Sequence, residues 1–304
     1  IVKFIRSKQD GKRLVNFNIS VAITEDFVEK VIKNEDYDLI NPRTNDITGQ
    51  LNAKEVFDLM TELAWETGDP GIVFMDRINS ENPNPQLGTI ESTNPCGEQP
   101  LLPFESCNLG SINLARMVSY TEDDTKIDWQ RLARVTKTAV HLLDNVIDMN
   151  NYPIDEIAEM SRTTRRIGVG VMGFSDLLVQ LGIRYDSEEA LVLGEDVMRV
   201  IQDEAYKSSI ELAETRGTFP AWEGSTYSKQ GPAGRPILPM RNSAPVTIAP
   251  TGTISIIAGA SSGIEPLFAL SYVRNVMDNT RLIEGNPYFE SVARNEGFYT
   301  PELM

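Results

Sequence analysis

Apolar residues recur along this chain with two different periods, and the change of period separates strands from helices. From Phe17 to Ile23 every second residue is large and apolar, which predicts a strand over Leu14–Ile23. Thr24 then predicts the N-cap of a short helix over Glu25–Ile32. The apolar run Gly71–Asp76 indicates a short buried strand.

Helical periods follow in longer segments. Asn52 and Glu55 resemble a capping box, and the apolar stripe behind them ends near Gly68. A long helix is predicted over Asp128–Met149, and its expected core-facing stripe is Leu132, Val135, Ala139, Leu142 and Val146. His141 lies within this helix and is interpreted as a structural histidine.

The second half of the chain repeats this alternation. Strands are predicted over Ile167–Met172 and Val246–Ala249, and a helix over Ser187–Arg216 that ends at Gly217. Strands that alternate with helices favour an α/β fold with a largely parallel sheet, open or closed into a barrel. Active sites of such folds lie where strands end in loops. No internal repeat or interdomain linker is evident, so residues 1–304 are expected to form a single segment.

Composition narrows the range of functions. With 304 residues, of which 41% are apolar, the chain can bury a sizeable core. Its net charge of −16 argues against nucleic-acid polymers and anionic membrane surfaces as partners. No apolar run approaches the roughly 18 residues of a membrane helix, and no export signal is evident, so a cytoplasmic protein is expected. The opening at Ile1 suggests a segment of a longer polypeptide.

The chain has 2 cysteines and 1 histidine, too few for a zinc site built from those residue types or for a disulfide scaffold. No metal site is therefore expected, and the cysteines matter chiefly as reactive thiols. A structural disulfide between Cys96 and Cys107 is the weaker alternative, because disulfides are rare in the cytosol.

The segment Thr93–Leu114 concentrates reactive groups. Asn94, Cys96 and Glu98 are spaced so that an extended backbone would present an amide, a thiol and a carboxylate on one side. A carboxylate can remove a proton, and a thiol can act as a nucleophile or as a one-electron hydrogen carrier. Taken alone, this spacing fits a polar loop with an incidental cysteine better than a catalytic site.

Longer blocks of sequence make the segment specific. The run from Asn94 to Glu98, continued to Ser111, resembles the finger loop of ribonucleotide reductases, most closely the adenosylcobalamin-dependent class II enzymes. The blocks Ala64–Asn79, Arg166–Gly182 and Ala249–Phe268 resemble the same family in the same order. The resemblance implies part of the family's ten-stranded α/β barrel, with a central finger loop at residues 93–108.

The family resemblance also implies roles for individual residues. Cys96 would carry the thiyl radical that abstracts the ribose 3′-hydrogen, Glu98 would take the proton of the 3′-hydroxyl, and Asn94 would hydrogen-bond the sugar. Cys107 would be one of two thiols that reduce the 2′-position and end as a disulfide. The family's partner cysteine lies well before the finger loop, but this chain has no cysteine before Cys96. The chain alone is therefore expected not to complete catalytic cycles.

A second segment is a candidate phosphate site. The predicted strand at Val246–Ala249 leads through a glycine- and hydroxyl-rich turn into an apolar helix, and the residues of this turn are Pro250, Thr251, Gly252, Thr253, Ile254 and Ser255. Backbone N–H groups at such a turn can hold an anion without any basic side chain. In isolation an ordinary helix cap is the simpler interpretation. The family resemblance instead implies that this turn binds substrate phosphates.

Three functional hypotheses follow. The first is the barrel segment of a class II ribonucleotide reductase that uses adenosylcobalamin, a ribonucleotide, an external dithiol reductant and the part of the enzyme upstream of Ile1, in a protein that could be a homodimer. The second is a segment of a class I large subunit, whose radical comes from a separate metal-containing subunit. The third is a catalytically incomplete fragment that binds nucleotides. Cobalamin dependence of activity separates the first two hypotheses.

Overall fold

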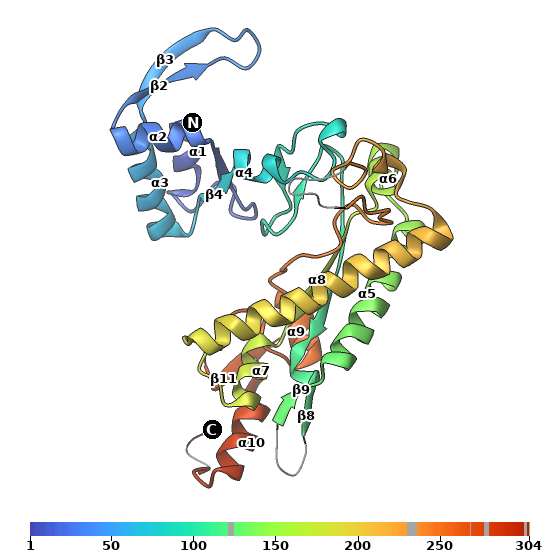
Figure 1. Ribbon diagram of the computed structural model, residues 1–304. Helices are drawn as coiled ribbons and strands as arrows, with labels where there is room; N and C mark the ends of the chain where they lie inside the picture. Colours follow the sequence, from blue (N-terminus) through green and yellow to red (C-terminus); the bar gives the residue numbers. More distant parts are fainter. Residues whose placement is uncertain (121–124, 230–235, 268, 277–279, 301–302, 304) are drawn as a thin grey trace. The chain divides into compact units, whose positions relative to one another are not determined.

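The computed structural model describes residues 1–120, 125–229, 236–267, 269–276, 280–300 and 303 (Figure 1). They form two compact units, Ile1–Pro103 and Phe104–Met304. The boundary falls inside the expected finger loop, so Cys96 belongs to the first unit and Cys107 to the second. That residues 1–304 make a single barrel segment stays a prediction.

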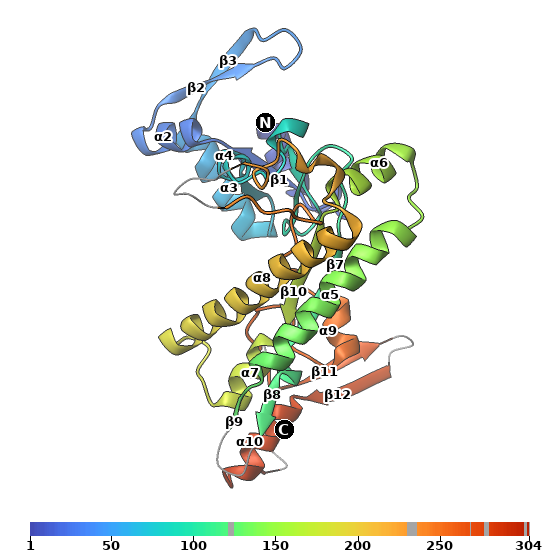
Figure 2. The same cartoon turned by 45° about the vertical axis from the view of Figure 1, so that its right-hand side comes forward.

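The first unit contains short strands and helices around a small core. In chain order its elements are α1 (Val2–Ile5), η1 (Arg6–Lys8), β1 (Ser20–Ile23), α2 (Glu25–Lys33), β2 (Asp36–Ile40), β3 (Ile47–Asn52), α3 (Ala53–Thr67), β4 (Gly71–Phe74), α4 (Met75–Ser80), η2 (Pro85–Leu87), β5 (Ser92–Thr93) and β6 (Pro100–Leu101). Strands β1 and β4 pair in parallel, whereas β2 with β3 and β5 with β6 form antiparallel pairs. The β2–β3 hairpin projects away from α2 and α3 (Figure 2).

Side-chain caps set the starts of α2 and α3 as the sequence predicts. The Thr24 hydroxyl accepts a hydrogen bond from the Phe27 N–H, and the Asn52 side chain accepts one from the Glu55 N–H. The predicted strand at Leu14–Ile23 is wrong in its first half. Leu14 has a positive φ of 51°, and the Phe17 N–H bonds the Leu14 carbonyl in a turn that leaves Phe17 64% exposed.

The second unit is built on long helices and short strands. Its elements are β7 (Asn108–Asn113), η3 (Leu114–Arg116), β8 (Val118–Tyr120), β9 (Thr125–Ile127), α5 (Trp129–Met149), α6 (Asp155–Thr164), β10 (Ile167–Met172), α7 (Phe174–Leu181), α8 (Glu188–Arg216), η4 (Pro220–Trp222), α9 (Gly252–Ala258), β11 (Ser271–Val276), β12 (Thr280–Gly285) and α10 (Pro287–Asn295). The cap residues Asp128, Ser187 and Gly217 lie where the sequence predicts them.

Strand β10 forms the centre of this unit. It pairs in parallel with β7, with Ile167 opposite Asn108, and all its residues are buried. Its other edge meets the segment predicted as a strand at Val246–Ala249, where the structure has only a parallel bridge between Val169 and Val246. Gly170 permits this close approach, because a Cβ atom there would lie 2.5 Å from the Thr247 carbonyl oxygen.

Helices α5 and α8 run side by side and cover one face of these strands (Figures 1 and 2). Val169 of β10, Leu143 of α5 and Ile201 of α8 belong to one buried cluster. After Leu132, the buried face of α5 is shifted by one residue from the expected stripe. The buried residues are Leu132, Thr136, Val140, Leu143, Asp144 and Ile147. The predicted Leu142 is 61% exposed instead.

Within the described ranges, no helix combines the length and the apolar character that a bilayer crossing requires.

Candidate active site

Cys96 lies in a tight turn at the end of the β5–β6 hairpin. The Asn94 N–H donates to the Gln99 carbonyl at 3.0 Å, which closes the turn below the thiol. Inside it the Gly97 N–H donates to the Asn94 carbonyl at 3.1 Å. Cys96 is exposed, and Asn94 and Glu98 are half-buried. The turn therefore brings an amide, an accessible thiol and a carboxylate together over a few residues.

The extended conformation expected for these residues is wrong. Gly97 has a φ of +84°, in the left-handed region that glycine adopts readily, and this reverses the chain. The Asn94 side-chain oxygen also accepts a hydrogen bond from the Gln99 N–H at 3.0 Å, so the asparagine closes the turn itself. The three residues therefore lie in a turn and not in an alternating strand.

Asn18 anchors this turn from a distant part of the first unit. Its side-chain amide donates to the Pro95 carbonyl at 2.6 Å, and that carbonyl belongs to the peptide group that leads into Cys96. Sequence reasoning missed Asn18, because it lies in the segment predicted as a regular strand. The bond fixes the peptide on which the thiol is mounted.

Cys107 immediately precedes β7 in the second unit, a strand along which successive side chains alternate between two faces. Ser106 meets Ser161 of α6, with 2.6 Å between the hydroxyl oxygens, and the Asn108 amide donates to the Leu143 carbonyl of α5. A Cβ on Gly110 would also touch Leu143. The even-numbered residues thus face the helices, so Cys107 belongs to the opposite face.

A buried ion pair joins the segments that precede β7 and β10. Arg166, just before β10, donates through Nε to Glu105 Oε1 at 2.9 Å, and the two side chains are 5% and 0% exposed. Removing water from both charges makes the pair costly unless it is well hydrogen-bonded. Neither residue stands out in the sequence: Arg166 is only the first residue of a family block, and no local pattern marks Glu105.

The expected phosphate turn leads into α9, a helix from Gly252 to Ala258. Thr251 has a φ of +56°, and its hydroxyl accepts a hydrogen bond from the Gly263 N–H at 2.7 Å. The Ser255 hydroxyl bonds the Gly252 carbonyl within the same turn. Both hydroxyls are thus engaged inside the protein. Gly252, Thr253 and Ile254 at the start of the helix are exposed, and the first N–H groups of a helix have no partner within it.

Asp176 of α7 holds the segment that follows α9. One carboxylate oxygen accepts from the Ser261 N–H at 2.6 Å, and the other accepts from the Asn286 side chain at 2.7 Å. The Gly173 N–H adds a bond of 2.7 Å to the Ser261 carbonyl. Asp176 is 1% exposed, so these bonds are shielded from water. The sequence analysis did not single out Asp176.

A second buried carboxylate gathers arginines beside α5. Asp144 is fully buried and contacts Arg165, Arg216 and Arg241. Arg165 also forms two bonds of 2.7 and 2.9 Å to Asp148. The hydrogen bonds from Arg165 hold the pKa of Asp148 below its ordinary value, against the opposing effect of burial. The sequence signal was an aspartate on the apolar face of α5, four residues after Val140.

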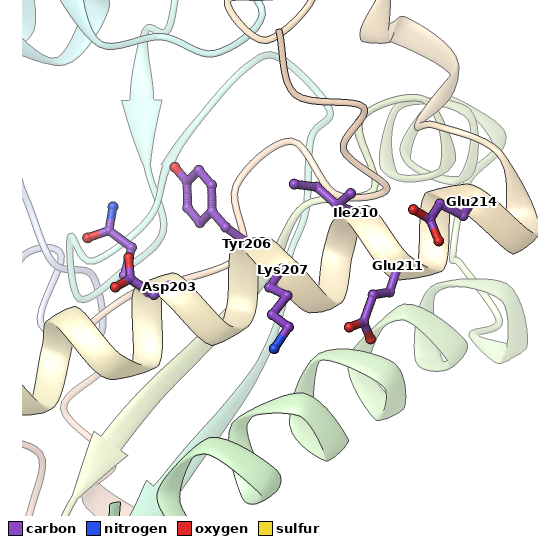
Figure 3. A pocket seen from close by; sticks show the side chains of 7 residues that line it. Asp203, Tyr206, Lys207, Ile210, Glu211 and Glu214 are labelled. Atoms are coloured by element: carbon purple, nitrogen blue, oxygen red, sulfur yellow. The ribbon is translucent and has the colours of Figure 1, made fainter. Parts of the chain in front are cut away.

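An open hollow along one face of α8 holds none of the predicted site residues (Figure 3). Its lining residues are Gln202, Asp203, Tyr206, Lys207, Ile210, Glu211 and Glu214. Lys137 of α5 pairs with Glu211 beside it. The hollow carries carboxylates, one lysine and one tyrosine but no thiol, and we assign it no part in the chemistry.

The predicted site residues are therefore distributed between the two units. Asn94, Cys96 and Glu98 share one turn of the first unit. Cys107 and the turn at residues 250–255 belong to the second unit. Cys107 precedes β7, whereas the turn follows the segment that runs parallel to β10, so these two lie toward opposite ends of the same strands.

Comparison with known proteins identifies the family. The model of the ribonucleotide reductase barrel domain matches residues 1–233 and 238–303. The chain belongs to the ribonucleotide reductase family. The Cys96 turn, Cys107 and the turn before α9 are thus parts of a ribonucleotide reductase barrel domain, and the α/β class expected from the sequence is confirmed.

Individual relatives agree with this assignment. The chain is 54% identical over 306 residues to a vitamin B12-dependent ribonucleoside-diphosphate reductase of Thermoplasma acidophilum, covering 100% of the chain and 38% of that protein. It is 48% identical over 305 residues to the protein of the same name from Mycobacterium tuberculosis, covering 100% of the chain and 42% of the relative. A ribonucleoside-diphosphate reductase subunit alpha of Chlamydia pneumoniae is 31% identical over 84% of the chain and 27% of its own length.

Proposed function

We propose that this chain supplies the radical-carrying part of a reductase that converts ribonucleoside diphosphates to 2′-deoxyribonucleotides. Cys96 carries the thiyl radical that abstracts the 3′-hydrogen, and Glu98 accepts the proton of the 3′-hydroxyl. Asn94 donates from its amide nitrogen to the sugar, because its oxygen is engaged by the Gln99 N–H. The observation that carries this proposal is the tight turn that presents an exposed thiol two residues from a carboxylate.

Reduction at the 2′-position consumes two electrons, which a pair of thiols supplies by forming a disulfide. Cys107 is proposed as one of these thiols. The chain has 2 cysteines, and Cys96 must stay available as the radical carrier. The second thiol therefore comes from outside these residues, and an external dithiol must reduce the disulfide after each turnover. We place this thiol chemistry in the cytoplasm, where cysteines stay reduced.

The turn at residues 250–255 is proposed to bind the diphosphate. The exposed N–H groups at the start of α9 and the helix dipole both favour an anion there. The Thr251 and Ser255 hydroxyls shape the turn and leave the contact with phosphate to the backbone. This arrangement suits a chain of charge −16, since it needs no basic side chain.

Adenosylcobalamin is the proposed cofactor, on the strength of relatives that are named vitamin B12-dependent and are 54% and 48% identical. When bound, this cofactor supplies the radical that oxidises a cysteine thiol. The exposed Cys96 fits that requirement, because a thiol that exchanges an electron with an outside group must be reachable. A separate radical-generating subunit, as in the class I hypothesis, would meet the same thiol.

The test is a chimera in which this chain replaces the matching region of the Thermoplasma relative. Deoxynucleotide is measured with ribonucleoside diphosphate, dithiol and adenosylcobalamin. We expect cobalamin-dependent turnover, and no turnover in Cys96→Ser, because the hydroxyl O–H bond is too strong for a radical carrier. Product from Cys96→Ser would refute the role of Cys96, and turnover that needs a metal-containing subunit instead of cobalamin would favour class I. The chain alone, in the same mixture, should give no repeated turnover.

A further inference from the structure

Arg166 has a buried donor that its ion pair leaves unused. The Nε group donates to Glu105, but among the described residues Arg166 Nη2 is buried without a hydrogen-bond partner. Leaving a buried, charged N–H group unsatisfied costs more than a hydrogen bond returns. Arg166 Nη2 is therefore available to an acceptor that comes within its reach.

The strand register brings this donor to Cys107. Ile167 pairs with Asn108, so Arg166 and Cys107 are the residues that immediately precede the first paired residues of two neighbouring parallel strands. Adjacent strands are about 4.8 Å apart, well within the reach of an arginine side chain. Ser106 and Asn108, on either side of Cys107, contact α6 and α5, and Glu105, to which Arg166 is bonded, lies two residues before Cys107.

We propose that Arg166 is a positioning residue for Cys107, and that its Nη2 group donates to the Cys107 sulfur when that sulfur becomes a thiolate. The redox role of Cys107 rests on the proposed function, whereas the reactivity of its thiol can be measured without turnover. Glu105 holds the guanidinium in place and offsets part of its charge. The pair thus sets both the direction and the strength of the positive charge beside the thiol.

The step that uses this contact is reduction of the disulfide between Cys107 and its partner thiol. A thiolate of the external dithiol attacks the partner sulfur, the disulfide bond breaks, and the electron pair leaves on Cys107. The second thiol of the reductant then displaces the partner as a thiolate, and the reductant ends as a disulfide. The two protons lost by the reductant go to the two thiolates. A thiolate that accepts a hydrogen bond from an N–H group is a better leaving group, so the disulfide breaks faster.

Nearby charges on the packed elements are otherwise engaged. Arg165, which follows α6, is bonded to Asp144 and Asp148 on the helix side of the strands. From α6 itself the contact with this segment is the neutral Ser161 hydroxyl. The ion pair described next to Cys107 consists of Glu105, two residues before it, and Arg166, the residue that precedes β10.

The experiment measures alkylation of Cys107 by iodoacetamide against pH in a Cys96→Ser background, where Cys107 is the remaining thiol. Arg166→Gln should move the midpoint of the profile to higher pH and slow alkylation below that midpoint by roughly three- to tenfold. Glu105→Gln, which removes the opposing charge, should move the midpoint to lower pH and speed alkylation. Arg166→Lys keeps the charge and should stay nearer to the parent protein than Arg166→Gln.

Opposite signs are the decisive feature of this test. If the pair were merely structural, both neutral variants would loosen the segment and shift alkylation in the same direction, which would overturn the proposal. Unchanged profiles in both would do so as well. If thermal unfolding shows that Arg166→Gln does not fold, the other two variants still test the proposal: the direction in which Glu105→Gln moves the alkylation midpoint, and the alkylation profile of Arg166→Lys. A shift of the expected signs in a chimera without turnover would count against the proposed function alone.

Discussion

The two thiols of this chain are held in very different ways. Cys96 is exposed in a turn closed by the short β5–β6 ladder and the Asn18 side chain. Cys107 directly precedes strand β7, which packs on α5, and lies two residues after Glu105 of a buried ion pair. A thiol that exchanges an electron with an outside group must be reachable, whereas one that forms and breaks a disulfide must hold its geometry. The contrast matches the two roles proposed.

The largest expected effect is on the stability of the second unit, which contains Cys107. Asp144→Ala leaves Arg165 and Arg241 buried with less compensation, so the free energy of unfolding of the second unit should fall by about 3–5 kcal/mol. Denaturant unfolding measures this, and alkylation of Cys96 in the first unit should not change. The matched control is Asp148→Ala, whose side chain is 50% exposed and should cost far less. Equal costs would show that the buried cluster does not hold the unit.

A second change tests the anion end of the same unit. Gly252 has open space where a Cβ would be added, so Gly252→Val fits the fold but covers the first turn of α9. Affinity for a ribonucleoside diphosphate, measured by calorimetry, should fall at least about tenfold, or roughly 1.4 kcal/mol. Ile257→Val, at a residue that is 80% exposed on the same helix, is the control and should bind normally. Unchanged affinity in Gly252→Val would place the phosphates elsewhere.

The third prediction concerns the anchor of the Cys96 turn. Asn18→Ala removes the bond to the Pro95 carbonyl, which should weaken the turn by about 0.5–1.5 kcal/mol. Hydrogen exchange of the amides at residues 94–99 should quicken by roughly two- to tenfold, while the amides of β7 keep their protection. Asn16→Ala, in the same exposed segment, is the control. An equal change in both variants would mean that the Asn18 bond contributes nothing specific.

The smallest effect is a pH dependence at the edge of the arginine cluster. The pKa of Asp148 is lowered in the folded protein by its hydrogen bonds from Arg165. Its stabilising contribution is therefore fully present above the ordinary value of 3.8 and is lost as the pH falls from there toward the folded pKa. Asp148→Asn should flatten the acid limb of a plot of unfolding free energy against pH. A limb as steep as that of the parent protein would contradict the assignment.

Local signals predicted the helix starts well and the conformation of the Cys96 turn poorly. Thr24, Asn52 and Ser187 cap their helices as expected, because a cap depends on bonds a few residues away. Alternation over 14–23 predicted too long a strand, since it cannot reveal the left-handed Leu14 that begins a turn. The predicted core-facing stripe of α5 was one residue out, because apolar residues occur on more than one side of this helix.

For the candidate site, the sequence indicated residues but not how they are arranged. The family blocks indicated Asn94, Cys96 and Glu98, but their extended arrangement was wrong because Gly97 and the Asn94 side chain close a turn. The partners of Asn18 and Arg166 lie 77 and 61 residues away, and no local period signals contacts of that range. Charged pairs such as Glu105 with Arg166 emerge only when strand register is known.

Because the boundary between the two units lies between Cys96 and Cys107, labels on the two thiols would measure the distance between the units. It has 2 cysteines, one in each compact unit, so any thiol-specific reagent attaches one probe to each unit without engineering. A pair of nitroxide labels would report the separation of the units as an interspin distance. Cys96 is exposed and Cys107 is half-buried, so Cys96 should react first with a thiol-specific dye. A donor dye added first would then label the first unit, and an acceptor dye added afterwards would label the second.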